Sequence, residues 1–426
     1  MEKQVIRKVT MRIMPFIMLL YFVNFLDRVN AGFAALSMNK AIGLSPEVFG
    51  FGGSLFAIGY FLFEVPSNLM LVKVGARVWI ARVMITWGLV SAGFAFVTGP
   101  ISYETLRFLL GLAEAGFFPG IILYLGFWFP SRQRAAATAL FMAAAPVSGV
   151  VGSLISGSLM ELPHVAGLSN WQWLFLIEAV PAIILGFLVL KVLSDGPETA
   201  SWLAPEERDW LVNELAAEQA ETHRHPRHVG GALRALLDPR VLLLAIVYTG
   251  VSAGSYTLAL WGPTMIKQFG YSSLEVGVLN GLPNIVAVIG MILWARHSDK
   301  TKERTWHVVL PCLVACGGMM LGANLPTILG VMFALILINT GTGSAKPPLW
   351  AMPSMFLSGS AAAAGLAVIN GIGGLGGVIG PVALGWSKGH TGSYQDGLYV
   401  LATLLIISAV CTVLVRQSRA RQAVQA

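Results

Sequence analysis

Charge is scarce in this sequence. Only 12% of the 426 residues are Asp, Glu, Lys or Arg, whereas 56% are hydrophobic and the mean hydropathy is +0.72. Soluble globular domains carry roughly a quarter charged residues, so the composition excludes an ordinary soluble chain. A single very large core would need many helices that are hydrophobic all round, which a lipid bilayer explains more simply. The sequence therefore predicts a polytopic membrane protein.

Cysteine and histidine are also few. Cys312, Cys316 and Cys411 all lie inside apolar segments, where we expect packing thiols and neither a disulfide framework nor a metal site. The seven histidines lie mostly in polar segments. The apolar segments contain no nucleophile motif and no phosphate-binding loop. We therefore predict that the protein is not an enzyme and holds no metal or other cofactor.

Long apolar runs dominate what is present. A membrane-crossing helix needs about 20 mostly apolar residues. Twelve segments meet this requirement: 11–33, 47–72, 77–98, 103–129, 135–160, 172–193, 239–267, 273–296, 305–325, 327–356, 361–387 and 395–416. The first of them is a full span with no small-residue cleavage site, so we expect no signal peptide. The predicted fold class is all-α, with twelve transmembrane helices.

The distribution of Lys and Arg predicts the orientation. Of 28 basic residues, 22 lie at the chain ends or in loops after even-numbered segments, three lie in the opposite loops and three lie within segments. Cytoplasmic loops carry the excess of Lys and Arg, so both termini should face the cytoplasm of a bacterial inner membrane. This bias also accounts for the net charge of +7, and no nucleic-acid partner is predicted.

A polar linker divides the chain. Residues 194–236 include LAPEERDWLVNELAAE, which has the pattern of a short amphipathic helix with a proline near its start. Six apolar segments precede the linker and six follow it. We therefore predict an N-terminal six-helix bundle (1–193), a cytoplasmic linker (194–236) and a C-terminal six-helix bundle (237–426). Transporters with a site between two repeats have this organisation.

Four ionisable residues attract attention inside the spans: Asp27 and Arg28 in the first, Arg107 and Glu114 in the fourth. Each costs about 2.5–3.5 kcal/mol in a bilayer, so such residues normally face a cavity or a partner. Both arginines are predicted near the outer end of their span, and two guanidiniums at one depth favour a carboxylate ligand. We predict that the two acids carry protons. Structural ion pairs without a ligand are the alternative.

Three more charged side chains lie in or near spans. Lys346 precedes two prolines, so we expect the helix to break there, with the lysine either contacting a substrate or reaching the cytoplasmic surface. Glu64 is predicted near the cytoplasmic end of the second span, with a helix-end or gate role. Glu178, at the start of the sixth span, is interpreted as structural.

Several motifs follow one another along the chain. They are FLDRVN, FEVPSN, KVGARVWIARVMITWG, RFLLGLAEAGFFPG, WFPSRQRAAATA, HSDKTKER and PPLWAMP. Together they resemble the anion:cation symporter family of the major facilitator superfamily, over nearly the whole chain. The likeness is greatest to bacterial tartrate, phthalate and hydroxyphenylacetate permeases, and more distant to galactonate permeases and vesicular glutamate transporters. It implies a monomer that works by alternating access between its two bundles, driven by a proton gradient.

The resemblance also implies roles for individual residues. It implies a substrate-binding set of Arg28, Arg107, Tyr60, Trp350 and Asn370. We add Lys346 to this set because of its charge. The proton-coupling residues are Asp27 and Glu114. Two copies of a cytoplasmic loop motif correspond to Gly75 and Arg77 and to Asp299 and Arg304, and Val72 replaces the acid of the first copy.

The predicted function is proton-coupled import of a small organic carboxylate such as tartrate or an aromatic or dicarboxylic acid. Sugar-acid permeases can carry Tyr where this chain has Phe25, which removes a hydroxyl donor. A sugar-acid symporter is nevertheless an alternative, and so is an anion uniporter or channel without proton coupling. The fifth span lacks the fuller Gly-Pro-Gly-Gly pattern of drug/proton antiporters, which disfavours efflux.

Overall fold

The computed structural model describes residues 1–224, 237–357 and 359–425 and is helical. It contains twelve helical segments long and apolar enough to cross a membrane, which confirms the predicted number. They are formed by α1 (Glu2–Ala41), α2 (Pro46–Val74), α3 (Ala76–Gly93), α4 (Pro100–Glu114) with α5 (Phe117–Gly126), α6 (Ser131–Met142) with α7 (Ala144–Leu159), α8 (Asn170–Val192), α11 (Pro239–Lys267), α12 (Ser273–Thr301), α13 (Thr305–Asn324), α14 (Ile328–Ala351), α15 (Gly359–Gly373) with α16 (Gly376–Thr391), and α17 (Gln395–Gln425).

Three of the spans are interrupted where the sequence predicted continuous helices. The fourth breaks at Ala115 and Gly116, between α4 and α5. Gly116 has a φ of +85°, a left-handed conformation that favours glycine, and a Cβ there would collide with the Ser67 side chain. The break allows α5 to change direction directly after Glu114.

The predicted break at Lys346 is wrong. Helix α14 continues through Pro347 and Pro348 and ends at Ala351, followed by a short 3-10 turn at Pro353–Met355. A proline ring crowds the carbonyl group four residues earlier in a helix. Here those earlier positions are the small residues Gly343 and Ser344, which leave more room for the rings. Packed membrane helices tolerate such prolines because neighbouring groups satisfy the freed backbone.

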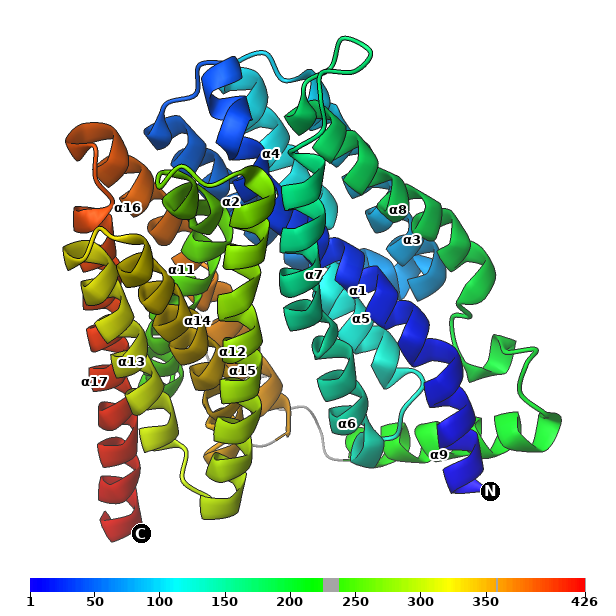
Figure 1. Cartoon of the computed structure of the whole chain (residues 1–426). Helices are drawn as coiled ribbons and strands as arrows, with labels where there is room; N and C mark the ends of the chain where they lie inside the picture. The colour runs from blue at the N-terminus through cyan, green and yellow to red at the C-terminus, as the bar shows by residue number, and fades with distance from the viewer. Residues whose placement is uncertain (225–236, 358, 426) are drawn as a thin grey trace.

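The helices form two groups, an N-terminal half (α1–α8) and a C-terminal half (α11–α17). Three helix pairs make the main contacts between them: α1 with α11, α2 with α16 and α7 with α12. These contacts lie toward the end of the molecule opposite the termini, and the halves diverge toward the end where both termini lie (Figure 1). The predicted domain boundaries and the assignment of the termini to the cytoplasm stay predictions.

Glycines allow the halves to approach at the joined end. The Cα of Gly277 on α12 would lie 3.0 Å from a Cβ added to Gly157 on α7, and the Cα of Gly385 on α16 would lie 3.1 Å from one added to Gly50 on α2. Small residues let membrane helices pack this closely. Exposed Glu161 of the N-terminal half also accepts hydrogen bonds from the amides of Ser273 (2.5 Å) and Leu274 (3.1 Å) at the start of α12.

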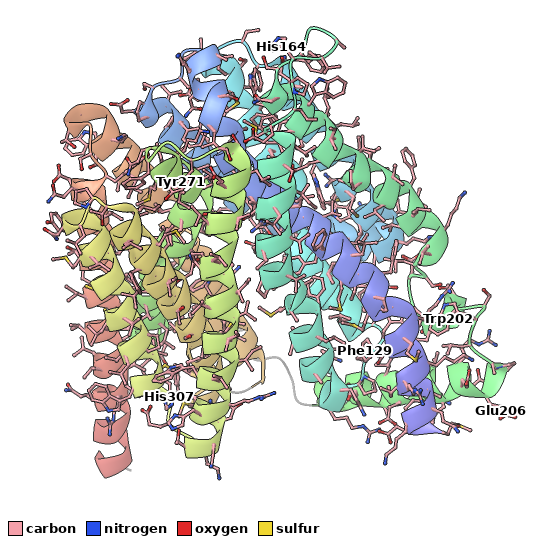
Figure 2. The ribbon with its side chains drawn as sticks, viewed as in Figure 1. Phe129, His164, Trp202, Glu206, Tyr271 and His307 are labelled. Carbon is pink, nitrogen blue, oxygen red and sulfur yellow. The ribbon has the colours of Figure 1, made fainter. Side chains whose placement is uncertain are left out.

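The labelled side chains show that successive loops lie at opposite ends of the molecule. Figure 2 places Phe129, Trp202, Glu206 and His307 toward the end of the molecule where the termini lie. It places His164 and Tyr271 at the opposite end. Loops that follow even-numbered spans therefore share one side of the molecule, as the Lys and Arg distribution predicts.

The amphipathic segment of the linker forms α9 (Pro205–Arg224), which lies against the N-terminal half. Lys8 pairs with Glu207 at 2.5 Å, and Arg132 pairs with Glu214 at 3.0 Å. The hydrogen bond from Lys8 lowers the pKa of the Glu207 carboxyl. Such exposed pairs are screened by water and salt, so they position α9 more than they stabilise the fold.

The two copies of the loop motif bind different partners. In the first, Gly75 has a φ of +99° and the Arg77 amide donates to Asp195 Oδ1 at 2.9 Å. Asp195 follows the sixth span, so a carboxylate from elsewhere faces the loop in which Val72 replaces the acid. In the second, Arg304 pairs with Asp299 at 2.7 Å inside the C-terminal half.

Candidate functional site

The centre of the N-terminal half contains a buried ion pair between two predicted site residues. Nε of Arg28 on α1 lies 3.4 Å from Oε2 of Glu114 on α4, and Asn24 donates to the same oxygen at 3.1 Å. The Glu114 side chain is 1% exposed, whereas that of Arg28 is 18% exposed. Arg28 therefore keeps access to solvent while its acidic partner is enclosed. This is the arrangement of a cation that can exchange an internal carboxylate for an external one.

Close packing of α4 on α2 sets this geometry. A Cβ at Gly111 would collide with the Phe56 carbonyl oxygen, so only glycine permits the approach. One turn of α2 then presents Phe56 and Tyr60 to Arg28, whose guanidinium carbon lies 5.8 and 5.5 Å from their ring centroids. Phe25 contributes a third ring at 5.5 Å. Aromatic faces attract a guanidinium without neutralising it, so Arg28 stays available to an anion.

Asp27, although adjacent to Arg28, faces a different environment. Adjacent helical residues point about 100° apart. Oδ1 of Asp27 accepts hydrogen bonds from Ser91 on α3 at 2.5 Å and from Asn30 at 2.6 Å, and the residue is 3% exposed. The two side chains thus lie on different faces of α1: Arg28 points toward α2 and α4, and Asp27 points toward α3.

The structure gives the two arginines different partners. Nε of Arg107 on α4 donates to the Tyr103 hydroxyl at 3.1 Å, and its guanidinium lies over the rings of Tyr103 and Phe94. Arg107 is 6% exposed and acts electrostatically on Asp27. Among the described residues, no carboxylate lies within 4.0 Å of its guanidinium. The proposed roles of both arginines in substrate binding stay predictions.

The C-terminal half contributes a third cation and two aromatic rings. Lys346 on α14 donates to Ser255 on α11 at 3.0 Å. The next residue, Tyr256, is close enough to Arg28 to interact with it electrostatically. Trp350 packs edge-on against Tyr248, with ring centroids 4.8 Å apart. Lys346 therefore lies where α14 packs against α11, and its contact with a substrate stays a prediction.

Sequence reasoning placed Glu64 at a helix end, and the structure places it within the site. Asn370 on α15 donates to Oε1 of Glu64 at 3.2 Å, a hydrogen bond that crosses between the halves. Glu64 also interacts electrostatically with Arg28 and Tyr60. Helix α2 continues ten residues beyond Glu64, to Val74, so Glu64 is not at the helix end. Its partner Asn370 is 306 residues away in the sequence, and local hydropathy gives no signal of that contact.

Comparison with known proteins decides the family. The sequence matches the model of the Major Facilitator Superfamily over residues 17–381. The chain belongs to this superfamily. An Agrobacterium vitis protein named as a candidate tartrate transporter is 60% identical over 418 residues, covering 98% of this chain and 92% of that protein. The relatives are consistent with the anion symporter branch that the motifs indicated.

Two further comparisons give another relative and a solved structure of the same fold. An Acinetobacter baumannii protein named as a quinolone resistance transporter is 40% identical and covers 100% of this chain and 98% of its own length. A crystal structure of a bacterial homologue of the human lysosomal transporter Spinster, inward-facing and unoccupied, superimposes with a TM-score of 0.78 at 16% identity, covering 97% of each chain. The protein is a multi-pass transporter of the bacterial cell membrane.

Proposed function

We propose that the protein imports a small organic dicarboxylate, of the tartrate class, together with protons. The contact between Arg28 and Glu114 is the observation that carries this proposal. A protonated Glu114 no longer attracts the guanidinium, and Arg28 then binds a substrate carboxylate through charge-assisted hydrogen bonds. The name of the 60% identical relative supports tartrate as the substrate to test first.

Proton loading also prepares the site for the change of access. A carrier that closes around a substrate anion and ionised acids would bury unpaired charge, which is costly in a low-dielectric interior. Protonation of the acids leaves a more nearly neutral site, so the halves can move around it. Release of substrate and proton on the cytoplasmic side restores the attraction between Arg28 and Glu114 and resets the carrier.

Purified protein in liposomes tests the proposed function. With an imposed inward proton gradient and no substrate gradient, we expect tartrate to accumulate inside. Dissipating the gradient with a protonophore should stop the accumulation. A uniporter or channel would only equilibrate tartrate, and that result would refute proton coupling.

Drug export is a second candidate, favoured by the 40% identical relative named as a quinolone resistance transporter. The same liposomes separate the two functions. A proton-driven movement of a quinolone antibiotic without tartrate transport would favour export, and competition by tartrate for one site would favour the carboxylate importer.

Lys346 should determine the preference for two carboxylates. Arg28 and Lys346 lie in opposite halves and offer one positive centre each, which suits a molecule with a carboxylate at either end. We expect Lys346→Ala to weaken tartrate binding at least about tenfold, since removing a charged hydrogen-bond partner costs roughly 1.5–3 kcal/mol. A matched monocarboxylate should lose little affinity. Calorimetric titration of both ligands measures the difference, and equal losses would make Lys346 a structural residue.

A further inference from the structure

A second pair of acids lies inside the N-terminal half, beside the Arg28–Glu114 contact. Asp27 on α1 and Glu178 on α8 are 3% and 2% exposed, and each is within electrostatic range of the other. Asn30, one turn from Asp27, donates to Asp27 at 2.6 Å and also interacts with the Glu178 carboxyl. One amide therefore connects two buried carboxyl groups that belong to different helices.

Each carboxyl has one satisfied and one unsatisfied oxygen. Oδ1 of Asp27 accepts from Ser91, and Oε1 of Glu178 accepts from Ser156 on α7 at 2.7 Å. The remaining oxygens, Oδ2 of Asp27 and Oε2 of Glu178, are buried and have no hydrogen-bond partner. Buried polar atoms in native proteins are nearly always paired. Protonation converts such an oxygen into a hydroxyl group that can donate as well as accept.

The surrounding charges do not neutralise the pair. Among the described residues, no Lys, Arg or His nitrogen lies within 4.0 Å of either carboxyl. From α1 and α4, Arg28 and Arg107 attract Asp27 over a longer distance, while Glu114 repels it. Two neighbouring carboxylates without a bonded cation cannot both stay ionised at low cost, and such pairs share a proton.

We propose that Asp27 and Glu178 hold one proton in common and that this carboxyl pair is a proton-loading site of the carrier. The proposal rests on the proton-coupled transport proposed above. The proton binds to a carboxylate oxygen from water on the outer side, forming an O–H bond, and returns to water on the cytoplasmic side when that bond breaks. Proton binding removes the repulsion between the two like charges.

Infrared titration of the substrate-free protein tests the pair directly, because a protonated carboxyl group has a carbonyl band that a carboxylate lacks. We expect the pair to contribute one such band, separate from that of Glu114, that is lost as pH rises in the wild-type protein. In Glu178→Gln and in Asp27→Asn, the midpoint of its loss should move to lower pH by about one unit or more, since each substitution removes the repelling charge. The double variant should lack the band of the pair, while that of Glu114 remains.

Glu104→Gln is the matched control, because it makes the same chemical change in the same half outside the pair. It should leave the midpoint unchanged. Size-exclusion chromatography and thermal unfolding show whether each variant is folded, and either single variant suffices if the other does not fold. Unchanged midpoints in the folded single variants would overturn the proposal. So would loss of the whole titration in Asp27→Asn alone, because Asp27 would then act without Glu178.

Failure of this inference can be told from failure of the proposed function. Proton uptake that accompanies tartrate binding, measured in weakly buffered solution, reports on coupling in the wild-type protein. If uptake occurs but Glu178→Gln binds tartrate with an unchanged pH profile, only the carboxyl pair is refuted. If tartrate binding takes up no proton, proton coupling itself is wrong and the pair is not a loading site.

Discussion

Arg28→Ala should lose tartrate binding by about 10- to 150-fold or more. The guanidinium is the partly exposed cation of the site, and a charge-assisted contact contributes roughly 1.5–3 kcal/mol. Arg28→Lys should recover only part of the affinity, since an ammonium cannot bind a carboxylate bidentately. Calorimetric titration of tartrate into purified protein measures both effects.

The Arg28→Ala variant needs two controls. Removing the arginine leaves Glu114 buried without its partner, which destabilises a protein by about 3–5 kcal/mol when a buried pair is broken. The double variant Arg28→Ala/Glu114→Gln should restore the thermal stability but not the binding. Arg82→Ala removes an arginine that lies over Trp79, away from the site, and should bind normally. Wild-type affinity in folded Arg28→Ala would refute the carboxylate site.

Glu114→Gln should separate binding from accumulation. The amide imitates the protonated acid and leaves Arg28 free, so tartrate should bind at least as tightly as in the wild-type protein. Proton-driven accumulation should fail, because residue 114 can no longer release a proton. Exchange of internal for external tartrate should survive, since exchange does not require that release. Liposome assays of uptake and exchange measure both activities.

The matched control for this substitution is again Glu104→Gln, which should accumulate tartrate normally. Accumulation against a gradient by Glu114→Gln at the wild-type level would mean that Glu114 is not the coupling acid. If Asp27→Asn also accumulated normally, the acid and base pair of the first span would be only structural.

Much of the fold follows from hydropathy because each span is a local property. About 20 apolar residues must form a helix in lipid, whatever surrounds them. The interruption between α4 and α5, and the continuity of α14 through its prolines, could not be predicted in this way. Gly116 breaks its span because it meets Ser67 of another helix, whereas Pro347 does not break α14, since its neighbours accommodate it.

The candidate site, like the fold, could be predicted only in part. The cost of intramembrane charge singled out Asp27, Arg28 and Glu114. Contacts between distant segments could not be predicted from the sequence. They are Arg28 with Glu114, Asn370 with Glu64, and Asn30 between Asp27 and Glu178. Partner choice depends on how helices rotate and cross, and a single sequence does not encode this in its local periodicity.

The joined end of the molecule has a consequence for how fast the carrier can turn over. Glycine faces such as Gly157 against Gly277 bury little side-chain area, and the carboxylate of Glu161 is solvent-exposed, so water can replace its hydrogen bonds to the amides of α12. Separating the halves there exposes no buried ion pair among the described residues, but it must part the buried rings of Phe49 on α2 and Trp261 on α11, whose centroids lie 5.0 Å apart. We expect this aromatic contact, and not the glycine faces, to hold the joined end closed during the cycle.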